Sequence, residues 1–275
     1  MVIVKLRGRL GNQMFQYAFG RCLAERWGSQ LLLDTSNLHS TGWQSPRPYR
    51  LDIFNLHPNI SATGDFATTS GVVLHIEQRK RGFHPTPHHI SSSIDVITRG
   101  WWQNENYFFD IKDMIRNEFR FKEDIHTPED MITLNRIRST NSVCVHIRRT
   151  DYVNSKNVMR FIGTEYYSSA FHSMAERINH PHFYIFSDDI EWCMQNLKCP
   201  GSHTFITRRV SAEESFAVDL NLMTKCRHFI TANSTFSWWA AWLGDAPYKI
   251  VIAPKLWFGD EHSSQHILPE DWVAI

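Results

Sequence analysis

The chain has 275 residues, of which 42% are hydrophobic and 21% are charged, and 29 basic against 28 acidic residues give a formal net charge of +1. This is the composition of a globular protein with one large or two smaller domains, and the charge balance argues against a general nucleic-acid or membrane-surface binder. Five cysteines without a C-x-x-C pair indicate buried free thiols in a reducing compartment rather than a disulfide scaffold.

The chain opens on a predicted β-α-β unit. Residues 2–6 read as a strand, a turn with Gly8 and Gly11 follows, and apolar residues recur at helical spacing from about 12 to 27. Residues 31–34 predict a second strand. The glycines would let the backbone approach a ligand closely, and the amino terminus of the helix would favour an anion. A tight turn without a ligand is equally compatible with the local sequence.

Prolines interrupt the pattern between residues 37 and 93, where His84, His88 and His89 form a cluster. Because no cysteine or carboxylate accompanies these histidines at ligand spacing, we interpret them as a loop surface rather than a metal site. The other expected elements of this half are a strand at 72–76, a strand end at 100–103 whose tryptophans could form an acceptor platform, and helices at 107–119 and 128–138.

A polar break at residues 138–142 marks the predicted domain boundary, which gives an amino-terminal domain of residues 1–139 and a carboxyl-terminal domain of residues 140–275. Strands alternate with helices in the second domain, so we expect a doubly wound parallel sheet. Its central strand is expected at 143–147, where β-branched residues suit burial on both faces. The remaining elements are expected as a helix at 164–177, a strand at 182–186, a helix, a strand at 204–207, a helix with a capping box at Ser211 and Glu214, a strand at 228–231, a helix at 236–243 and a strand at 249–253.

Polar residues follow three of these strands. They are Arg148, Arg149 and Asp151; Ser187, Asp188 and Asp189; and Asn233, Ser234 and Thr235. Ligands of open α/β sheets bind beyond the carboxyl ends of the strands, so these groups would converge on one crevice if the strands are neighbours. Paired guanidiniums match phosphate oxygens, and a helix amino terminus adds donors, which together favour a nucleotide-type ligand. Each of the three groups also has a purely structural interpretation. The arginines and Asp151 could form a surface turn with an internal ion pair, Asp188 could be a turn residue, and Ser234 could be an ordinary helix cap. No ligand spacing indicates a required metal, and no cofactor is expected.

Four stretches together resemble a known family. Gly8 to Tyr17 (GRLGNQMFQY) resembles the opening motif of the α-1,2-fucosyltransferases, glycosyltransferase family 11. His146 to Tyr152 (HIRRTDY) resembles the H-x-R-R-x-D motif that this family shares with the α-1,6- and protein O-fucosyltransferases. Residues 186–189 and 232–242 are similar to two further family motifs, in the expected order. Where the family commonly has Gly-Gly, this chain has Gly8-Arg9.

The resemblance implies two Rossmann-like domains that face a cleft, which is the glycosyltransferase B type of fold. It places GDP-fucose mainly on the carboxyl-terminal domain and the acceptor on the amino-terminal domain. The implied reaction is the inverting, metal-independent transfer of L-fucose from GDP-fucose to the 2-hydroxyl of a terminal galactoside on an oligosaccharide acceptor. Without a metal, cationic side chains must stabilise the charge that develops on the β-phosphate. The related motif points to Arg148 and Arg149 without deciding which of them is closer.

The same resemblance assigns the other site residues. Asn12, in the turn formed with Gly8, Gly11 and Gln13, would face the phosphates of the donor. His146 and one of Asp188 and Asp189 would read the guanine, while the neighbouring Ser187 and the residues Asn233, Ser234 and Thr235 would line the donor site. Asp151 would either act as general base or orient the arginines, and an oxocarbenium-like path would need no dedicated base.

No apolar run approaches the roughly 18 residues of a membrane helix, and no long apolar signal core opens the chain. We therefore expect a cytoplasmic protein without a transmembrane segment, which could associate peripherally with the inner face of a bacterial inner membrane, and no nucleic-acid partner. The alternatives in function are a fucosyltransferase of other linkage, acceptor or donor, and a non-catalytic protein that binds nucleotide sugars or glycans. Retention of Arg148, Arg149 and Asn12 disfavours the non-catalytic alternative.

Overall fold

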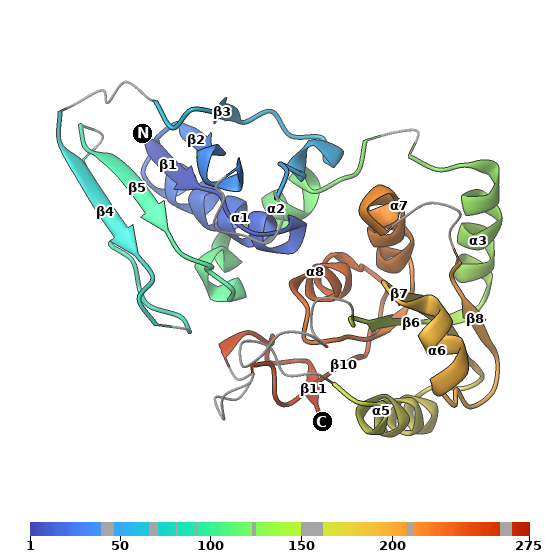
Figure 1. Cartoon of the computed structure of the whole chain (residues 1–275). Helices are drawn as coiled ribbons and strands as arrows, with labels where there is room; N and C mark the ends of the chain where they lie inside the picture. The colour runs from blue at the N-terminus through green and yellow to red at the C-terminus, as the bar shows by residue number, and fades with distance from the viewer. Residues whose placement is uncertain are drawn as a thin grey trace. The chain divides into compact units, whose positions relative to one another are not determined.

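The structure is a computed structural model that describes residues 1–39, 47–65, 71–80, 82–91, 93–122, 125–149, 162–207, 212–258 and 266–275. The chain divides into two compact units, residues 1–122 and 123–275 (Figure 1). This boundary lies earlier than the one expected after residue 139. The reason is that helix α3 (Pro128–Ser139) packs against strand β6 (Asn141–Ile147) and helix α7 (Ala212–Thr224), so it belongs to the second unit.

The first unit contains a five-stranded parallel sheet in the order β3-β2-β1-β5-β4. Its strands are β1 (Val2–Lys5), β2 (Leu31–Asp34), β3 (Asn59–Ser61), β4 (Val73–Glu77) and β5 (Asp95–Arg99). The predicted strands at 2–6, 31–34 and 72–76 are confirmed, and β5 runs into the strand end predicted at 100–103. The short edge strand β3, most of which is solvent-exposed, was not predicted because it lacks an apolar face.

Helix α1 (Leu10–Arg26) packs against β1 and β2 and confirms the predicted crossover helix. Most of its side chains are buried, since the helix lies in the core of this unit. Gly20 faces β1 so closely that a Cβ atom there would overlap the side chain of Val4 and lie 3.1 Å from Leu31 Cδ1. The missing side chain therefore sets how closely helix and sheet approach.

The remaining helical segments of the first unit are short. They are η1 (Ser36–His39), η2 (Leu51–Ile53), η3 (Glu105–Tyr107), η4 (Phe109–Ile111) and α2 (Lys112–Glu118). The helix predicted at 107–119 is thus two single turns followed by α2. Phe108, between the two turns, has φ −137° and ψ 16°, which are not helical angles and interrupt the run.

The second unit contains a six-stranded parallel sheet in the order β11-β10-β9-β6-β7-β8. Strand β6 is central, and the others are β7 (Pro181–Ser187), β8 (His203–Phe205), β9 (His228–Ile230), β10 (Val251–Ala253) and β11 (Val273–Ala274). The prediction of a doubly wound parallel sheet is confirmed.

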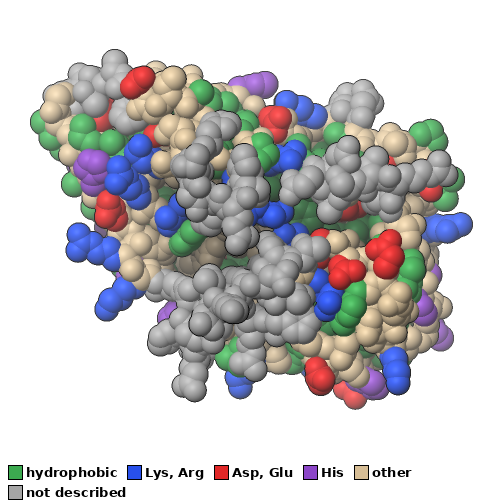
Figure 2. Space-filling model, viewed as in Figure 1, with side chains coloured by type: hydrophobic (Ala, Val, Ile, Leu, Met, Phe, Trp, Pro, Cys, Tyr) green, Lys and Arg blue, Asp and Glu red, His purple; other side chains and the backbone are tan. Residues whose placement is uncertain are grey.

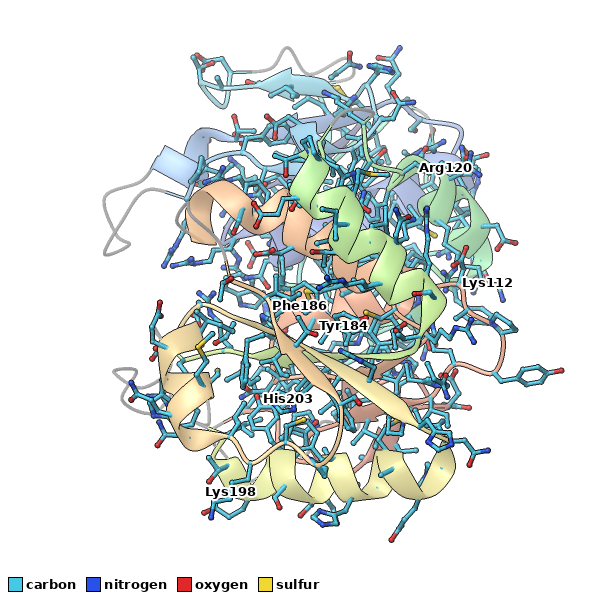
Figure 3. All side chains as sticks on the ribbon, turned by 90° about the vertical axis from the view of Figure 1, so that its right-hand side faces the viewer. Lys112, Arg120, Tyr184, Phe186, Lys198 and His203 are labelled. Carbon is cyan, nitrogen blue, oxygen red and sulfur yellow. The ribbon has the colours of Figure 1, made fainter. Side chains whose placement is uncertain are left out.

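Helices cover both faces of this sheet. Val145 and Ile147 of β6 pack in one core cluster with residues of α5 (Thr164–Arg177) and with Cys193 of α6 (Ile190–Asn196). Side chains alternate along a strand, so Cys144 and His146 point to the other face. On that side α3 contacts β6, and α7 packs against α8 (Thr235–Leu243). Figure 3 shows the two layers, with α3 and α5 on opposite sides of the strands.

The state of the cysteines and the distribution of surface charge agree with the expectations from the sequence. All five cysteines are free thiols and four are buried, which confirms the expected state. None of the helices in the described ranges combines the length and hydrophobicity of a bilayer span. Basic and acidic side chains are interspersed on the face drawn in Figure 2, in line with the small net charge.

We predict that Gly20→Ala destabilises the protein by roughly 1–3 kcal/mol, because the added methyl group overpacks the contact between α1 and β1. Urea denaturation measures the change in the free energy of unfolding. Asn135→Ala on the exposed face of α3 is the control and should be close to neutral. A gain in stability for Gly20→Ala, as helix propensity alone would give, contradicts the packing described for α1.

Candidate functional site

The three strands that end in polar residues are neighbours in one parallel sheet, in the order β9-β6-β7. His146 pairs with Phe186 and Ile147 with Ser187, so the arginines follow β6 at the level where the aspartates follow β7. On the other side of β6, Val145 pairs with Ile230. All three polar strand ends therefore lie at one edge of the sheet, as the sequence predicted.

The carboxylate of Asp188 joins the ends of β6 and β7. Its Oδ2 lies 3.1 Å from Nη1 of Arg148, and its Oδ1 accepts a 2.9 Å hydrogen bond from the backbone N–H of Arg149. The side chains of Arg148 and Asp188 are only 16% and 6% exposed. Charge-assisted hydrogen bonds of this kind are the stronger ones, and burial protects them from screening by salt. Asp188 therefore holds the side chain of Arg148 and the backbone of Arg149 in place at the end of β6.

Two contacts hold the guanidinium of Arg149, an ion pair at its edge and an aromatic ring against its face. Its Nε lies 3.0 Å from Oδ2 of Asp189, and its Cζ lies 3.5 Å above the centroid of the Trp192 ring. The other oxygen of Asp189 accepts a 3.3 Å hydrogen bond from the N–H of Trp192 and so caps α6. The N–H of Asp189 donates to Oγ of Ser187 at 3.0 Å. These contacts fix Arg149 against the start of α6.

His146 is the buried titratable group of the site. Its side chain is 5% exposed, its ring lies 5.6 Å from that of Phe236, and its Nδ1 has no hydrogen-bond partner among the described residues. Burial lowers the pKa of His146 to about 4, an effect that nearby Asp188 opposes and Arg148 reinforces. At neutral pH the imidazole is therefore uncharged, with a buried polar atom available to a ligand.

The turn after β9 is built around the start of α8. Oγ of Ser234 accepts a 3.4 Å hydrogen bond from the N–H of Phe236 and caps the helix. Nδ2 of Asn233 donates to the carbonyl of Trp257 at 2.8 Å. Thr235 is the first helical residue and is partly exposed. Ser234 and Asn233 thus hold the turn in place, and the amino terminus of α8 lies beside the end of β6.

In the first unit, the turn between β1 and α1 requires a glycine at position 8. Gly8 has φ +79°, and a Cβ atom there would lie 2.6 Å from Nδ2 of Asn12 and 3.1 Å from the ring of Trp101. The side chain of Gln13 stabilises this turn through three hydrogen bonds. Its Nε2 donates to the carbonyls of Gly8 at 3.0 Å and Pro48 at 2.9 Å, and its Oε1 accepts from the N–H of Arg50 at 2.9 Å. Gly11 is buried in the first turn of α1.

The loop after β5 reaches the same turn. Oδ1 of Asn12 accepts a 2.8 Å hydrogen bond from Nε2 of Gln103, which is 91 residues away in the sequence. The loop itself is held by Gln78, whose Oε1 accepts from the N–H groups of Trp101 and Trp102 at 3.0 and 2.9 Å. Trp102 adopts φ +54° and stacks on Phe19 with ring centroids 4.0 Å apart. Gln103 is a candidate site residue; the sequence indicated this strand end through its tryptophans but gave the glutamine no role.

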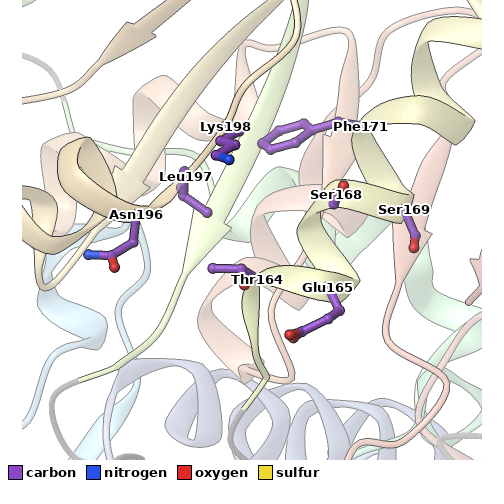
Figure 4. A pocket seen from close by; sticks show the side chains of 8 residues that line it. All are labelled: Thr164, Glu165, Ser168, Ser169, Phe171, Asn196, Leu197 and Lys198. Atoms are coloured by element: carbon purple, nitrogen blue, oxygen red, sulfur yellow. The ribbon is translucent and has the colours of Figure 1, made fainter.

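Some expected features lie elsewhere. Asp151 and Ser211 fall outside the described residues. In the part of the chain that the structure describes, no three His, Cys, Asp or Glu side chains are grouped so that they could hold a metal ion. A pocket of about 460 Å³ lies between the first turns of α5 and the end of α6, and it contains none of the predicted site residues (Figure 4). It is lined by Thr164, Glu165, Ser168, Ser169, Phe171, Asn196, Leu197 and Lys198.

Comparison with solved structures identifies similar folds. The fucosyltransferase NodZ from Bradyrhizobium matches with a TM-score of 0.54 at 13% identity, covering 91% of this chain and 94% of that one. A structure of POFUT1 in complex with GDP-fucose matches with a TM-score of 0.55 at 12% identity, covering 92% and 97%. Together with the two parallel α/β units, these similarities confirm the expected fold of the glycosyltransferase B type.

Sequence comparison identifies relatives along the whole chain. An α-1,2-colitosyltransferase of Escherichia coli is 35% identical over 299 residues, covering 100% of this chain and 99% of that protein. The O-antigen biosynthesis glycosyltransferase WbnK of Escherichia coli is 27% identical, covering 98% and 99%. Galactoside 2-alpha-L-fucosyltransferase Sec1 of Mus musculus is 27% identical, covering 100% and 74%. The family described as Glycosyl transferase family 11 matches residues 82–275. With this match over more than half of its length, and with a full-length relative at 35% identity, the chain belongs to glycosyltransferase family 11.

Proposed function

We propose that the protein transfers L-fucose from GDP-fucose to the 2-hydroxyl of a terminal galactoside, with inversion at the fucose carbon. The observation that carries this proposal is the polar edge of the second sheet, where Arg148 follows β6, His146 lies near the end of β6, and the amino terminus of α8 follows the adjacent strand β9. These groups suit a nucleoside diphosphate. The linkage is supported by relatives named as galactoside 2-alpha-L-fucosyltransferases.

The central chemical need is to stabilise the leaving group. When the bond between C1 of fucose and the β-phosphate oxygen breaks, the electron pair goes to GDP, and preorganised donors must meet the growing negative charge. We assign this contact to Arg148. The guanidinium of Arg149 already has one edge on Asp189 and one face on Trp192, which suits a residue that positions the loop. Asp188 would hold Arg148 in place before the substrate arrives.

We assign recognition of the base to His146. Both Asp188 and Asp189 are bound to arginines, so a neutral imidazole with a buried and unpartnered Nδ1 is the better candidate for a hydrogen bond to guanine. The turn at Asn12 would contact the phosphates of the donor, as the family resemblance implies. Because Gln103 donates to Oδ1 of Asn12, the Nδ2 donors of that amide are directed away from Gln103. Asp151 stays a candidate both for the general base and for a residue that orients the arginines.

A second candidate function is the transfer of colitose to the same hydroxyl. The supporting observation is the relative that is named as an α-1,2-colitosyltransferase and is 35% identical over the full chain. Colitose is fucose without its 3-hydroxyl, so the reaction at C1 and the charge on the leaving GDP are the same. The two functions differ only in whether the protein binds that hydroxyl.

Incubation with GDP-fucose or GDP-colitose and a panel of β-galactosides that includes lactose tests both functions. We expect release of GDP and an α-linked sugar on O2 of galactose, with faster transfer from GDP-fucose, measured by mass spectrometry and NMR of the product. Activity should persist in EDTA. Absence of transfer from both donors would refute the proposed function, and loss of activity in EDTA that Mn²⁺ restores would refute the metal-independent mechanism.

We predict that Arg148→Ala lowers kcat by about 10²–10³ without unfolding the protein, because it removes one preorganised donor to the leaving group. Arg149→Ala should also lower kcat strongly, and Trp192→Leu should lower it in the same direction, because both release the loop that carries Arg148. Arg177→Ala on the exposed side of α5 is the control. Steady-state kinetics and thermal unfolding measure these effects, and turnover near that of the wild type in folded Arg148→Ala would exclude our assignment.

The lowered pKa of His146 also predicts a dependence of stability on pH. In the unfolded chain this histidine takes up a proton near pH 6.5, whereas in the folded protein it resists protonation down to about pH 4. The unfolded state therefore binds more protons in this window, and acidification favours unfolding. We expect the free energy of unfolding to fall by roughly 3 kcal/mol more in the wild type than in His146→Gln between pH 6.5 and 4. Urea titrations at several pH values measure this, and parallel curves for the two proteins would disprove the burial described for His146.

A further inference from the structure

Two adjacent tyrosines of α5 donate hydrogen bonds to the backbone at the ends of two neighbouring strands, β6 and β9. The hydroxyl of Tyr167 donates to the carbonyl of His146 at 3.2 Å, and the hydroxyl of Tyr166 donates to the carbonyl of Thr231 at 2.8 Å. The hydroxyl of Tyr166 also lies 3.3 Å from the carbonyl of Ile252. Phenylalanine rings would fill the same space in the core, so the hydroxyl groups themselves need an explanation.

The position of α5 directs both hydroxyl groups to the same edge of the sheet. The helix packs on the face of the strands opposite α3 (Figure 3). Tyr167 belongs to its buried stripe and is 1% exposed, while Tyr166 packs at the border of this core with its ring centroid 5.0 Å from that of Tyr167. Buried tyrosine hydroxyls usually have a hydrogen-bond partner. Here the partners are backbone carbonyls at the edge where the polar residues of the site lie.

The carbonyl of Thr231 has no donor in the next strand, β10. In a parallel pair of strands, a residue donates to one residue of its neighbour and accepts from the residue two positions further along. The N–H of Thr231 donates to the carbonyl of Ile252 at 2.9 Å, so its own carbonyl would accept from position 254. That position is Pro254, which has no N–H. Tyr166 therefore supplies the donor that β10 lacks.

The carbonyl of His146 occupies a comparable place in β6. The pairing of β6 with β9 ends one residue earlier, at Val145. Tyr167 holds the backbone just beyond this last pair. Arg148 follows two residues after the first carbonyl, and Asn233 follows two residues after the second. The tyrosines thus fix the chain immediately ahead of the polar groups of the site.

We propose that Tyr166 and Tyr167 are positioning residues for the donor, which hold the ends of β9 and β6 so that the start of α8 and the guanidinium of Arg148 stay aligned. This inference rests on the proposed function, because it takes these two strand ends as the site of the diphosphate. Asp188 holds Arg148 from the end of β7, and Tyr167 holds the same strand end from α5. A displacement of about 1 Å in such a site can lower a rate by about 10².

Kinetics of tyrosine variants test the proposal. Tyr167→Phe and Tyr166→Phe remove one hydroxyl each and keep the ring, a small change that the fold should tolerate. Tyr184→Phe is the matched control, because Tyr184 is also 1% exposed and its hydroxyl shares a 3.1 Å hydrogen bond with Oγ1 of Thr140, which precedes the other end of β6. Thermal unfolding measures stability, steady-state kinetics with the donor and acceptor that the wild type uses give kcat and KM, and isothermal titration gives the Kd for GDP.

All three variants should lose a similar amount of stability, whereas their effects on the reaction should differ. Tyr167→Phe should lower kcat about tenfold with little change in the KM for the donor, because Arg148 acts on charge that develops in the transition state. Tyr166→Phe should raise the Kd for GDP about fivefold, since donors at the start of α8 bind the diphosphate before and during the reaction. Tyr184→Phe should keep the kcat and the Kd of the wild type.

A compensating change tests the contact with Thr231 separately. Pro254→Ala provides a backbone N–H that can complete the pairing of β10 with the carbonyl of Thr231. Tyr166→Phe combined with Pro254→Ala should therefore bind GDP nearly as tightly as the wild type. A merely structural role of the hydroxyl would not link the affinity for GDP to this position.

A wild-type kcat in Tyr167→Phe, or a wild-type Kd for GDP in Tyr166→Phe, overturns the role assigned to that tyrosine. Equal kinetic losses in Tyr184→Phe overturn the proposal as a whole, because they would follow from lost stability alone. Failure of the proposed function is read separately, from wild-type protein that binds GDP but transfers no sugar. In that case the Kd values of Tyr166→Phe and of the compensated variant still decide whether this tyrosine positions the binding site.

Discussion

The arrangement of the site depends on one carboxylate. Asp188, at the end of β7, binds both the side chain of Arg148 and the backbone of Arg149 at the end of β6. A nearly buried carboxylate is tolerated there because it is paired and hydrogen-bonded, and removal of it would leave a partly buried guanidinium without its partner. The pairing of β6 with β7 brings these groups together before any ligand binds. Electrostatic catalysis requires this kind of preorganisation, since the donors then need not rearrange during the reaction.

The fold could largely be predicted from the sequence because its strands are buried and its helices are periodic. The strand at Leu31–Asp34 and the helix at Thr164–Arg177 are found where the pattern indicated. The boundary between the units, after residue 122, lies earlier than the polar break in the sequence. A polar break after residue 138 ends a helix, but only the packing of α3 against β6 and α7 assigns that helix to the second unit. Local sequence does not contain such tertiary contacts.

The site was predictable to the extent that strand order brings strand ends together. The polar residues after β6, β7 and β9 could be expected at one edge once these strands were taken as neighbours. The side chains that hold them could not. The stacking of Arg149 on Trp192 spans two strand ends, and the hydrogen bond between Gln103 and Asn12 joins residues 91 positions apart. Such contacts depend on side-chain directions that no motif encodes.

The two arginines of the β6 end are therefore distinguished by what holds them, with Arg148 bound by Asp188 and Arg149 fixed between Asp189 and Trp192. A crystal structure of the protein with GDP tests this account most directly. We predict that the guanidinium of Arg148 lies within hydrogen-bond distance of the β-phosphate, while Arg149 keeps its contacts with Asp189 and Trp192. A β-phosphate bound by Arg149, or a diphosphate away from the ends of β6, β7 and β9, would contradict it.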